Sequence, residues 1–263
     1  MSGLRKGYAD TSFGQVHVVE LGTGSPVLLL HQTPRSWDEY AELLPLLGRR
    51  VRAIAMDTIG FGASAPLAEH SIGNYAAAAI ELLDALGIDE VDLLGHHTGG
   101  VVAVEVAARA PERVRRAVFS STPYIDAEAR KQPSRRAPID PVTERADGAH
   151  LVELWRRRQD FYPPDRPDLL SRFVRDALTL GPDAERGHEA VSAYRMEERV
   201  GRISCPVLCL GASADPFAFP DLERLAAQLP AAETAVIDGG MIPLMEQRAA
   251  EVAELVLEFL LSR

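Results

Sequence analysis

Residues 92–101, DLLGHHTGGV, join a buried strand to the start of a helix. The apolar residues before Gly95 are typical of a strand, and the run from Thr98 to Pro111 has the length of a helix. Between them stands the pattern glycine-x-residue-x-glycine, which ends at Gly99 and has His97 at its centre. Such a tight turn presents its central side chain at the head of the helix. The stretch therefore predicts an α/β fold with an imidazole at a candidate site.

Short apolar runs alternate with helical patterns on both sides of this stretch. Strands are expected at 15–22, 25–31, 50–57, 90–95, 115–121, 205–211 and 233–238, and helices at 36–48, 71–88, 98–110, 221–229 and 244–261. Ser36 is the expected N-cap of its helix. Strands that alternate with helices in this order form a mostly parallel central sheet flanked by helices on both faces.

The alternation stops in the middle of the chain. Between about residues 123 and 200 no clear strand is visible, and the stretches 148–162 and 168–181 favour helices. A chain of 263 residues is long enough for one large domain with an insertion. The predicted organisation is a core formed by 1–122 and 201–263, with a helical cap insertion at 123–200.

Composition narrows the possible partners. The net charge is −10 and the basic runs are short, so we expect no nucleic-acid binding. No apolar run approaches the roughly 18 residues that span a bilayer, and the first ten residues do not resemble a signal peptide, so a cytoplasmic protein is expected. Cys205 and Cys209 are expected to be free thiols. No metal-ligand spacing or dinucleotide loop is present, so neither a metal nor a cofactor is expected, and nothing indicates an oligomeric state.

Five segments, in this order, resemble landmarks of the α/β-hydrolase fold superfamily. They are LLLHQTPRSWDEY at 28–40, similar to the oxyanion loop His-Gly-x-Pro; AMDTIGFGAS at 55–64; the turn at 95–99, similar to the nucleophile elbow; CPVLCLGASADPF at 205–217, similar to the turn that carries the catalytic acid; and VIDGGMIPLMEQ at 236–247, similar to the loop that carries the catalytic histidine. The resemblance covers nearly the whole chain. It implies an α/β-hydrolase fold with a cap where the helical insertion lies.

The resemblance also implies a catalytic triad, and two of its three positions are changed. The family's nucleophile is serine, aspartate or cysteine, and His97 stands there instead. Met241 occupies the position of the catalytic histidine, whereas Asp215 retains the acid. Gln32 stands where the oxyanion loop normally has glycine. The ordinary serine-hydrolase mechanism therefore does not carry over to this sequence.

An imidazole offers different chemistry from a hydroxyl. Serine needs a neighbouring base, whereas imidazole, with an ordinary pKa of about 6.5, is partly neutral at pH 7 and takes a proton or attacks a carbonyl unaided. A histidine at 97 is thus consistent with the loss of the base at 241. The backbone N–H groups of Thr33 and Thr98 are expected to form an oxyanion hole, because the second begins a helix. The residues expected to line or support the pocket are His31, Gln32, His96, Met241 and Trp37.

Three functions stay open on these residues. The first is hydrolysis of an ester, lactone, thioester or C–C bond in a small carbonyl compound, with His97 as general base or nucleophile and Asp215 beside it. The second is a lyase, cyclase or isomerase reaction in which His97 removes a proton next to a carbonyl. The third is a non-catalytic protein that binds a small ligand in the same pocket. The expected partner is a small molecule in every case.

Overall fold

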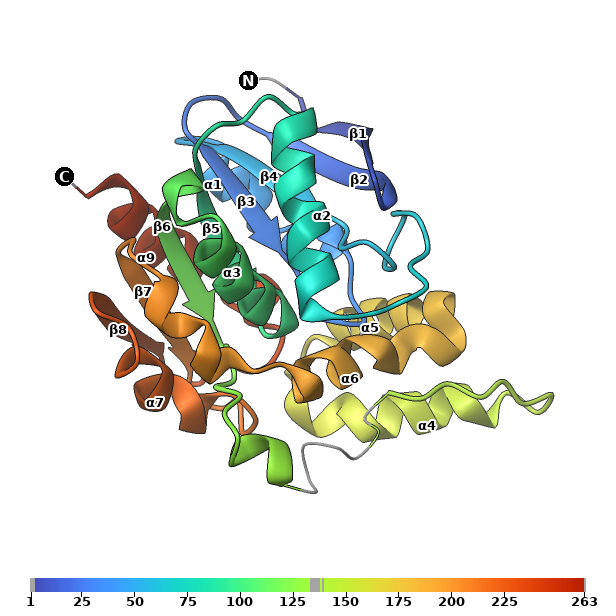
Figure 1. Cartoon of the computed structure of the whole chain (residues 1–263). Coiled ribbons are helices and arrows are strands. Elements are labelled where there is room, and N and C mark those ends of the chain that lie inside the picture. Colours follow the sequence, from blue (N-terminus) through green and yellow to red (C-terminus); the bar gives the residue numbers. More distant parts are fainter. Residues whose placement is uncertain (1–2, 133–137, 139, 263) are drawn as a thin grey trace.

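The computed structural model describes residues 3–132, 138 and 140–262, and its centre is one eight-stranded sheet (Figure 1). The strands are β1 (Arg5–Thr11), β2 (Gly14–Leu21), β3 (Pro26–Leu30), β4 (Arg52–Met56), β5 (Val91–His96), β6 (Val114–Ser120), β7 (Val207–Ala212) and β8 (Ala232–Ile237). Their order in the sheet is β1-β2-β4-β3-β5-β6-β7-β8. β1 pairs antiparallel with β2 and β2 with β4, and the remaining pairs are parallel.

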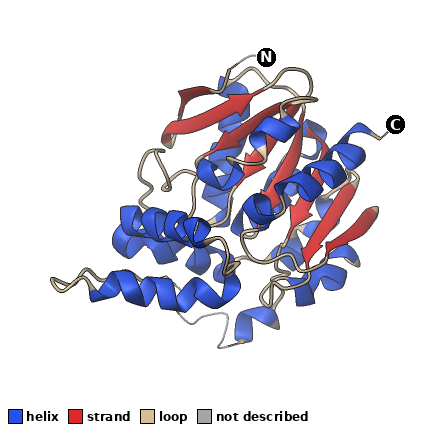
Figure 2. Ribbon diagram, turned by 180° about the vertical axis from the view of Figure 1, so that it is seen from behind, coloured by secondary structure: helices blue, strands red, loops and turns tan. Residues whose placement is uncertain are grey.

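Helices cover both faces of the sheet. They are α1 (Leu44–Leu47), α2 (Ile72–Ala85), α3 (Thr98–Arg109), α4 (Ala149–Arg158), α5 (Pro167–Leu180), α6 (Arg186–Ala193), α7 (Leu222–Ala226), α8 (Leu244–Gln247) and α9 (Ala249–Leu261). α2, α3 and α7 pack on one face, in front in Figure 1. α1, α8 and α9 pack on the other, which Figure 2 shows from behind. The predicted fold class, a mostly parallel sheet flanked by helices, is confirmed.

The segment between β6 and β7 is helical, and no strand occurs among its described residues. α4, α5 and α6 gather beside one end of the sheet (Figure 1). α4 and α5 share a small apolar core of their own, to which Leu154, Leu169 and Phe173 contribute. The stretches 148–162 and 168–181 thus contain helices, as the sequence indicates. The division into a core at 1–122 and 201–263 and a cap at 123–200 stays a prediction.

Two helices differ from the sequence prediction. The helix expected at 36–48 is wrong, because residues 37–40 form a 3₁₀ turn (η1, Trp37–Tyr40) and α1 begins only at Leu44. Ser36 makes no side-chain capping bond, and the N–H of Trp37 donates to Asp57 Oδ1 at 2.6 Å. Pro45 lies at the start of α1, where its missing N–H costs nothing. The helix expected at 244–261 is interrupted at Arg248 and forms α8 and α9.

No helix in the described ranges is both long enough and apolar enough to cross a bilayer.

Candidate active site

His97 stands on the turn between β5 and α3, and its backbone is strained. Its φ of 48° and ψ of −115° are rare for a residue with a side chain, and such strain is concentrated at functional sites. Its N–H donates to Ser120 O at 3.0 Å, which ties the turn to β6. Glycine permits the close approach that follows, because a Cβ on Gly99 would lie 1.8 Å from Leu30 O. The sequence therefore folds into the sharp turn that the glycine pattern predicts.

The imidazole of His97 faces the carboxylate of Asp215. His97 Nε2 lies 2.9 Å from Asp215 Oδ2, and the two side chains are 15% and 0% exposed. Neither atom makes an aligned hydrogen bond with any described residue, so this contact is an ion-pair distance with imperfect angles. The other oxygen, Oδ1, accepts from the N–H groups of Phe217 at 3.0 Å and Ala218 at 3.3 Å.

The charge of Asp215 determines the tautomer of His97. Burial raises the pKa of Asp215, but the charge and contact of His97 outweigh that effect and hold the pKa below its ordinary value. The carboxylate is thus ionised near pH 7 and only accepts hydrogen bonds. We therefore assign the imidazole proton to Nε2, which faces it. The basic lone pair of His97 then lies on Nδ1.

His96 connects the turn to the loop that carries Met241. Its Nε2–H donates to Ile242 O at 2.9 Å, and its Nδ1 accepts from Ser120 Oγ at 3.2 Å. Complete burial and the neighbouring imidazole of His97 lower the pKa of His96 to about 3, so this ring is neutral. Its ring centroid lies 4.7 Å from that of His97, with the rings nearly perpendicular. Met241 is half-buried, and its N–H donates to Gln247 Oε1 at 2.8 Å.

The two threonines expected to form the oxyanion hole lie together. Thr33 Oγ1 and Thr98 Oγ1 are 2.9 Å apart, and both residues are buried. The N–H of Thr98 stands at the first position of α3, where no intrahelical acceptor exists. The carbonyl of Gln32 accepts from His31 Nδ1–H at 2.7 Å and from Arg35 N–H at 3.0 Å. Since C=O and N–H point in opposite directions across a trans peptide, the N–H of Thr33 points away from both donors.

The remaining predicted pocket residues have their own partners. His31 is fully buried, its Nε2 accepts from Thr58 N–H at 2.9 Å, and burial lowers its pKa. Gln32 directs its amide to Glu39, as described below. Trp37 lies under Lys6, whose Nζ is 4.3 Å from the ring centroid. Trp37 also lines a hollow of about 270 Å³ between its loop and α5.

Comparison with known proteins identifies the family. The sequence model described as alpha/beta hydrolase fold matches residues 25–247. The chain belongs to the α/β-hydrolase family. Over 146 residues it is 32% identical to bifunctional epoxide hydrolase 2 of Sus scrofa, which covers 54% of this chain and 26% of that protein. Over 110 residues it is 36% identical to 2-hydroxy-6-oxo-2,4-heptadienoate hydrolase of Pseudomonas putida, which covers 40% of each protein.

A solved structure supports the same fold. The crystal structure of the enol-lactonase from Burkholderia xenovorans LB400 superposes with a TM-score of 0.81 at 21% identity and covers 97% of this chain and 100% of that one. At that identity the likeness shows the fold alone. The chain spans less than half the length of these two relatives.

This member of the α/β-hydrolase family has a buried ionic cluster beside the loop that follows β3. Arg35 is fully buried and pairs with Asp176 Oδ2 of α5 at 2.8 Å and Glu246 Oε1 of α8 at 2.6 Å. Glu39 is also fully buried there, and burial raises the pKa of both Glu39 and Glu246 to about 7. Oη of Tyr162 is buried without a hydrogen bond to a described residue. Sequence reasoning missed this cluster. The only signal in the sequence was the spacing of four residues between the oppositely charged Arg35 and Glu39.

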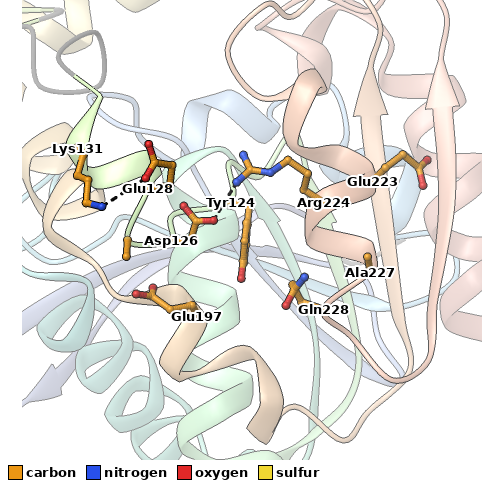
Figure 3. Close-up of a pocket in the computed structure, with 10 residues that line it drawn as sticks. Tyr124, Asp126, Glu128, Lys131, Glu197, Glu223, Arg224, Ala227 and Gln228 are labelled. Atoms are coloured by element: carbon orange, nitrogen blue, oxygen red, sulfur yellow. Dashed lines mark hydrogen bonds and ion pairs between the residues drawn. The ribbon is translucent and has the colours of Figure 1, made fainter.

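One hollow in this member of the α/β-hydrolase family has no residue of the His97 turn in its lining. It has a volume of about 810 Å³, and Tyr124, Asp126, Glu197 and Arg224 are among its lining residues (Figure 3). Asp126 pairs with Arg224 at 2.9 Å, and none of the residues expected at the site lines it. Within the described residues, no three His, Cys, Asp or Glu side chains gather as a metal site requires. A site without metal or cofactor stays a prediction.

Proposed function

We propose that this α/β-hydrolase-family chain hydrolyses a small organic carbonyl compound, with His97 as general base and Asp215 as the residue that orients it. The observation that carries the proposal is the 2.9 Å contact between His97 Nε2 and Asp215 Oδ2 on the strained turn. In the family pattern, Asp215 would orient a histidine at position 241. Here the acid contacts an imidazole at the nucleophile position instead, so base and acid form a pair without serine.

The chemistry follows from the free lone pair on Nδ1. Nδ1 takes a proton from water while the hydroxide forms a bond to the carbonyl carbon. The π electrons move to the carbonyl oxygen, which accepts from the N–H groups of Thr33 and Thr98. The tetrahedral adduct then collapses, and the leaving group takes the proton from the imidazolium. The products are an acid and an alcohol, thiol or carbon acid.

We favour base catalysis over nucleophilic attack by His97. Attack would form an acyl-imidazole, which hydrolyses readily and must then be cleared by water without a second base, because Met241 has no proton acceptor of suitable basicity. Activation of water in one step avoids that intermediate. The relatives named as an epoxide hydrolase, a dienoate hydrolase and an enol-lactonase support hydrolysis of a small organic substrate.

A second function rests on the same pair of residues. A base beside two backbone donors also suits removal of a proton α to a carbonyl, as in a lyase, cyclase or isomerase, and this reaction needs no nucleophile. This reaction needs a neutral imidazole at position 97, with its proton on Nε2 facing Asp215. In the third alternative, the pocket binds a small ligand without catalysis.

A panel of p-nitrophenyl esters, beginning with the acetate, tests these functions. We expect hydrolysis by the unsubstituted chain and a loss of about 10²-fold or more in kcat in His97→Ala. His150→Ala, which removes a histidine from α4, is the matched control and should retain kcat within about twofold. Hydrolysis that survives His97→Ala contradicts the proposal. Deuterium uptake from D₂O into a carbonyl ligand without hydrolysis would favour the lyase, cyclase or isomerase reaction. Ligand binding that His97→Ala leaves unaffected would favour a non-catalytic binding protein.

A further inference from the structure

Gln32 stands at a position where the family usually has glycine, and its two N–H groups converge on one carboxylate. The backbone N–H of Gln32 donates to Glu39 Oε2 at 2.8 Å. Its side-chain Nε2–H donates to Glu39 Oε1 at 2.5 Å. Gln32 is 5% exposed and Glu39 0%. The side chain of Gln32 is therefore held against Glu39.

The other side of the same residue is held as well. The carbonyl of Gln32 accepts from His31 Nδ1–H and from the N–H of Arg35. That carbonyl belongs to the peptide whose N–H is contributed by Thr33. Movement of Gln32 therefore changes the direction of the Thr33 N–H, and a donor aimed about 1 Å wrongly loses much of its value in catalysis.

We propose that Glu39 is a positioning residue of the oxyanion hole, which fixes the Thr33 amide by binding both N–H groups of Gln32. The inference rests on the proposed function, since it assigns a role within the same site. Glu39 touches no reacting atom and acts through Gln32. The charge on Glu39 matters because a carboxylate offers two acceptor oxygens, whereas a protonated carboxyl presents a donor on one of them.

The groups that face Glu39 come from four parts of the chain. Arg35 of the same loop favours the charged form, whereas Asp176 of α5 and Glu246 of α8 disfavour it. Tyr162, from the segment between α4 and α5, and Tyr40 also face it, and both stay neutral because burial raises their pKa values above the ordinary one. Burial is the largest influence on Glu39 and raises its pKa to about 7. The two hydrogen bonds from Gln32 to Glu39, which we call the Gln32 clamp, therefore strengthen as pH rises through about 7 and weaken below it.

Amide hydrogen exchange of the whole chain tests the clamp without a substrate. At pH 8, Glu39→Gln replaces one acceptor with an NH₂ group, so we expect the amide of Gln32 to exchange roughly tenfold faster or more. Glu42→Gln is the matched control, because Glu42 lies on the same segment but bonds to Arg172. Unchanged exchange at Gln32 in Glu39→Gln would overturn the proposal, and so would equal acceleration in Glu42→Gln.

Steady-state hydrolysis of p-nitrophenyl acetate tests the effect on catalysis. Loss of one whole oxyanion donor lowers kcat by about 10² to 10³, so a misdirected donor in Glu39→Gln should lower kcat by roughly 10- to 100-fold with KM within about twofold. The acid limb of the kcat profile near pH 7 should also become less steep. Gln32→Ala removes one of the two bonds, and its effect should be less than additive with Glu39→Gln. Additive effects, or a change in KM alone, would overturn the positioning role.

The two proposals fail in different ways. Absence of His97-dependent hydrolysis in the unsubstituted chain overturns the proposed function, whereas the exchange of the Gln32 amide still determines whether Glu39 holds the loop. His97-dependent hydrolysis that Glu39→Gln leaves unchanged overturns the inference about Glu39 and supports the proposed function.

Discussion

Replacement of Asp215 by asparagine should invert the tautomer of His97. Asparagine keeps an oxygen at Oδ1, so the hydrogen bonds from Phe217 and Ala218 are preserved. Its NH₂ group takes the place of Oδ2, which lies 2.9 Å from His97 Nε2. Two donors cannot face each other, so the imidazole proton moves to Nδ1 and the lone pair to Nε2. His97 Nδ1 then carries a proton and cannot take one from water, although the fold is unchanged.

The size of the effect follows from the distance. In the transition state His97 carries a positive charge, and a carboxylate at 2.9 Å stabilises it by about 6 kcal/mol at an effective dielectric constant of about 20, but by about 1.4 kcal/mol in water. The imidazole is 15% exposed and the carboxylate is buried, which places the environment between these limits. Loss of about 4 kcal/mol lowers kcat by about a thousandfold.

Steady-state hydrolysis of p-nitrophenyl acetate provides the measurement, with thermal unfolding as the check on the fold. Asp215→Asn should lower kcat about a thousandfold and leave Tm within a few degrees. Asp126→Asn, which removes a carboxylate from the distant hollow in Figure 3, should leave kcat within about twofold. Retention of more than a tenth of kcat in Asp215→Asn would refute the assignment of the lone pair to Nδ1.

Three further predictions concern the neighbouring residues. His97→Ser should hydrolyse p-nitrophenyl acetate no faster than His97→Ala in the same assay, because Met241 supplies no base to activate the serine. His96→Leu should lower the free energy of unfolding in urea by about 0.5–1.5 kcal/mol, because it removes the hydrogen bond from His96 Nε2–H to Ile242 O, which keeps only the N–H of Leu244 as a donor. The pKa of Glu39 is about 7 in the folded chain, whereas its ordinary value is 4.5. The folded chain therefore binds the Glu39 proton more tightly than the unfolded chain does, so the free energy of unfolding falls as pH rises from about 4.5 to 7. Urea unfolding at pH 5 and pH 8 measures this loss of stability. The free energy of unfolding should fall between the two pH values by up to about 3 kcal/mol less in Glu39→Gln than in the unsubstituted chain.

The sequence predicts the buried parts of the sheet better than its edge. β3 and β5 are covered on both faces, so they consist of continuous apolar runs that are visible without a structure. β1 was not predicted, because it is an edge strand with mostly exposed side chains and charges at Arg5, Lys6 and Asp10. The helix predicted at 36–48 is wrong because the chain forms a 3₁₀ turn at Trp37–Tyr40 and begins α1 only at Leu44, a break that apolar periodicity does not reveal.

The candidate site shows the same division between local and distant causes. The turn at His97 is predictable because its glycine spacing is a local requirement of the backbone. The contact with Asp215 brings together residues far apart in the chain, and only the resemblance to the family anticipated it. The bonds of Gln32 to Glu39 were not anticipated, because the environment of that carboxylate depends on Asp176 and Glu246, from α5 and α8.

The changes at positions 97 and 241 have a common geometric basis. Asp215 lies on the turn after β7, and its Oδ1 is held by backbone N–H groups, so its position does not depend on which imidazole it faces. A histidine on the elbow therefore reaches the acid without any movement of β7. The loop that contains Met241 is tied to the turn by His96, whose Nε2–H donates to Ile242 O. His97 is the N-cap of α3 and Thr98 its first residue, so the base and one oxyanion donor that we propose are consecutive residues. These contacts support our proposal that position 97 provides the base in place of position 241.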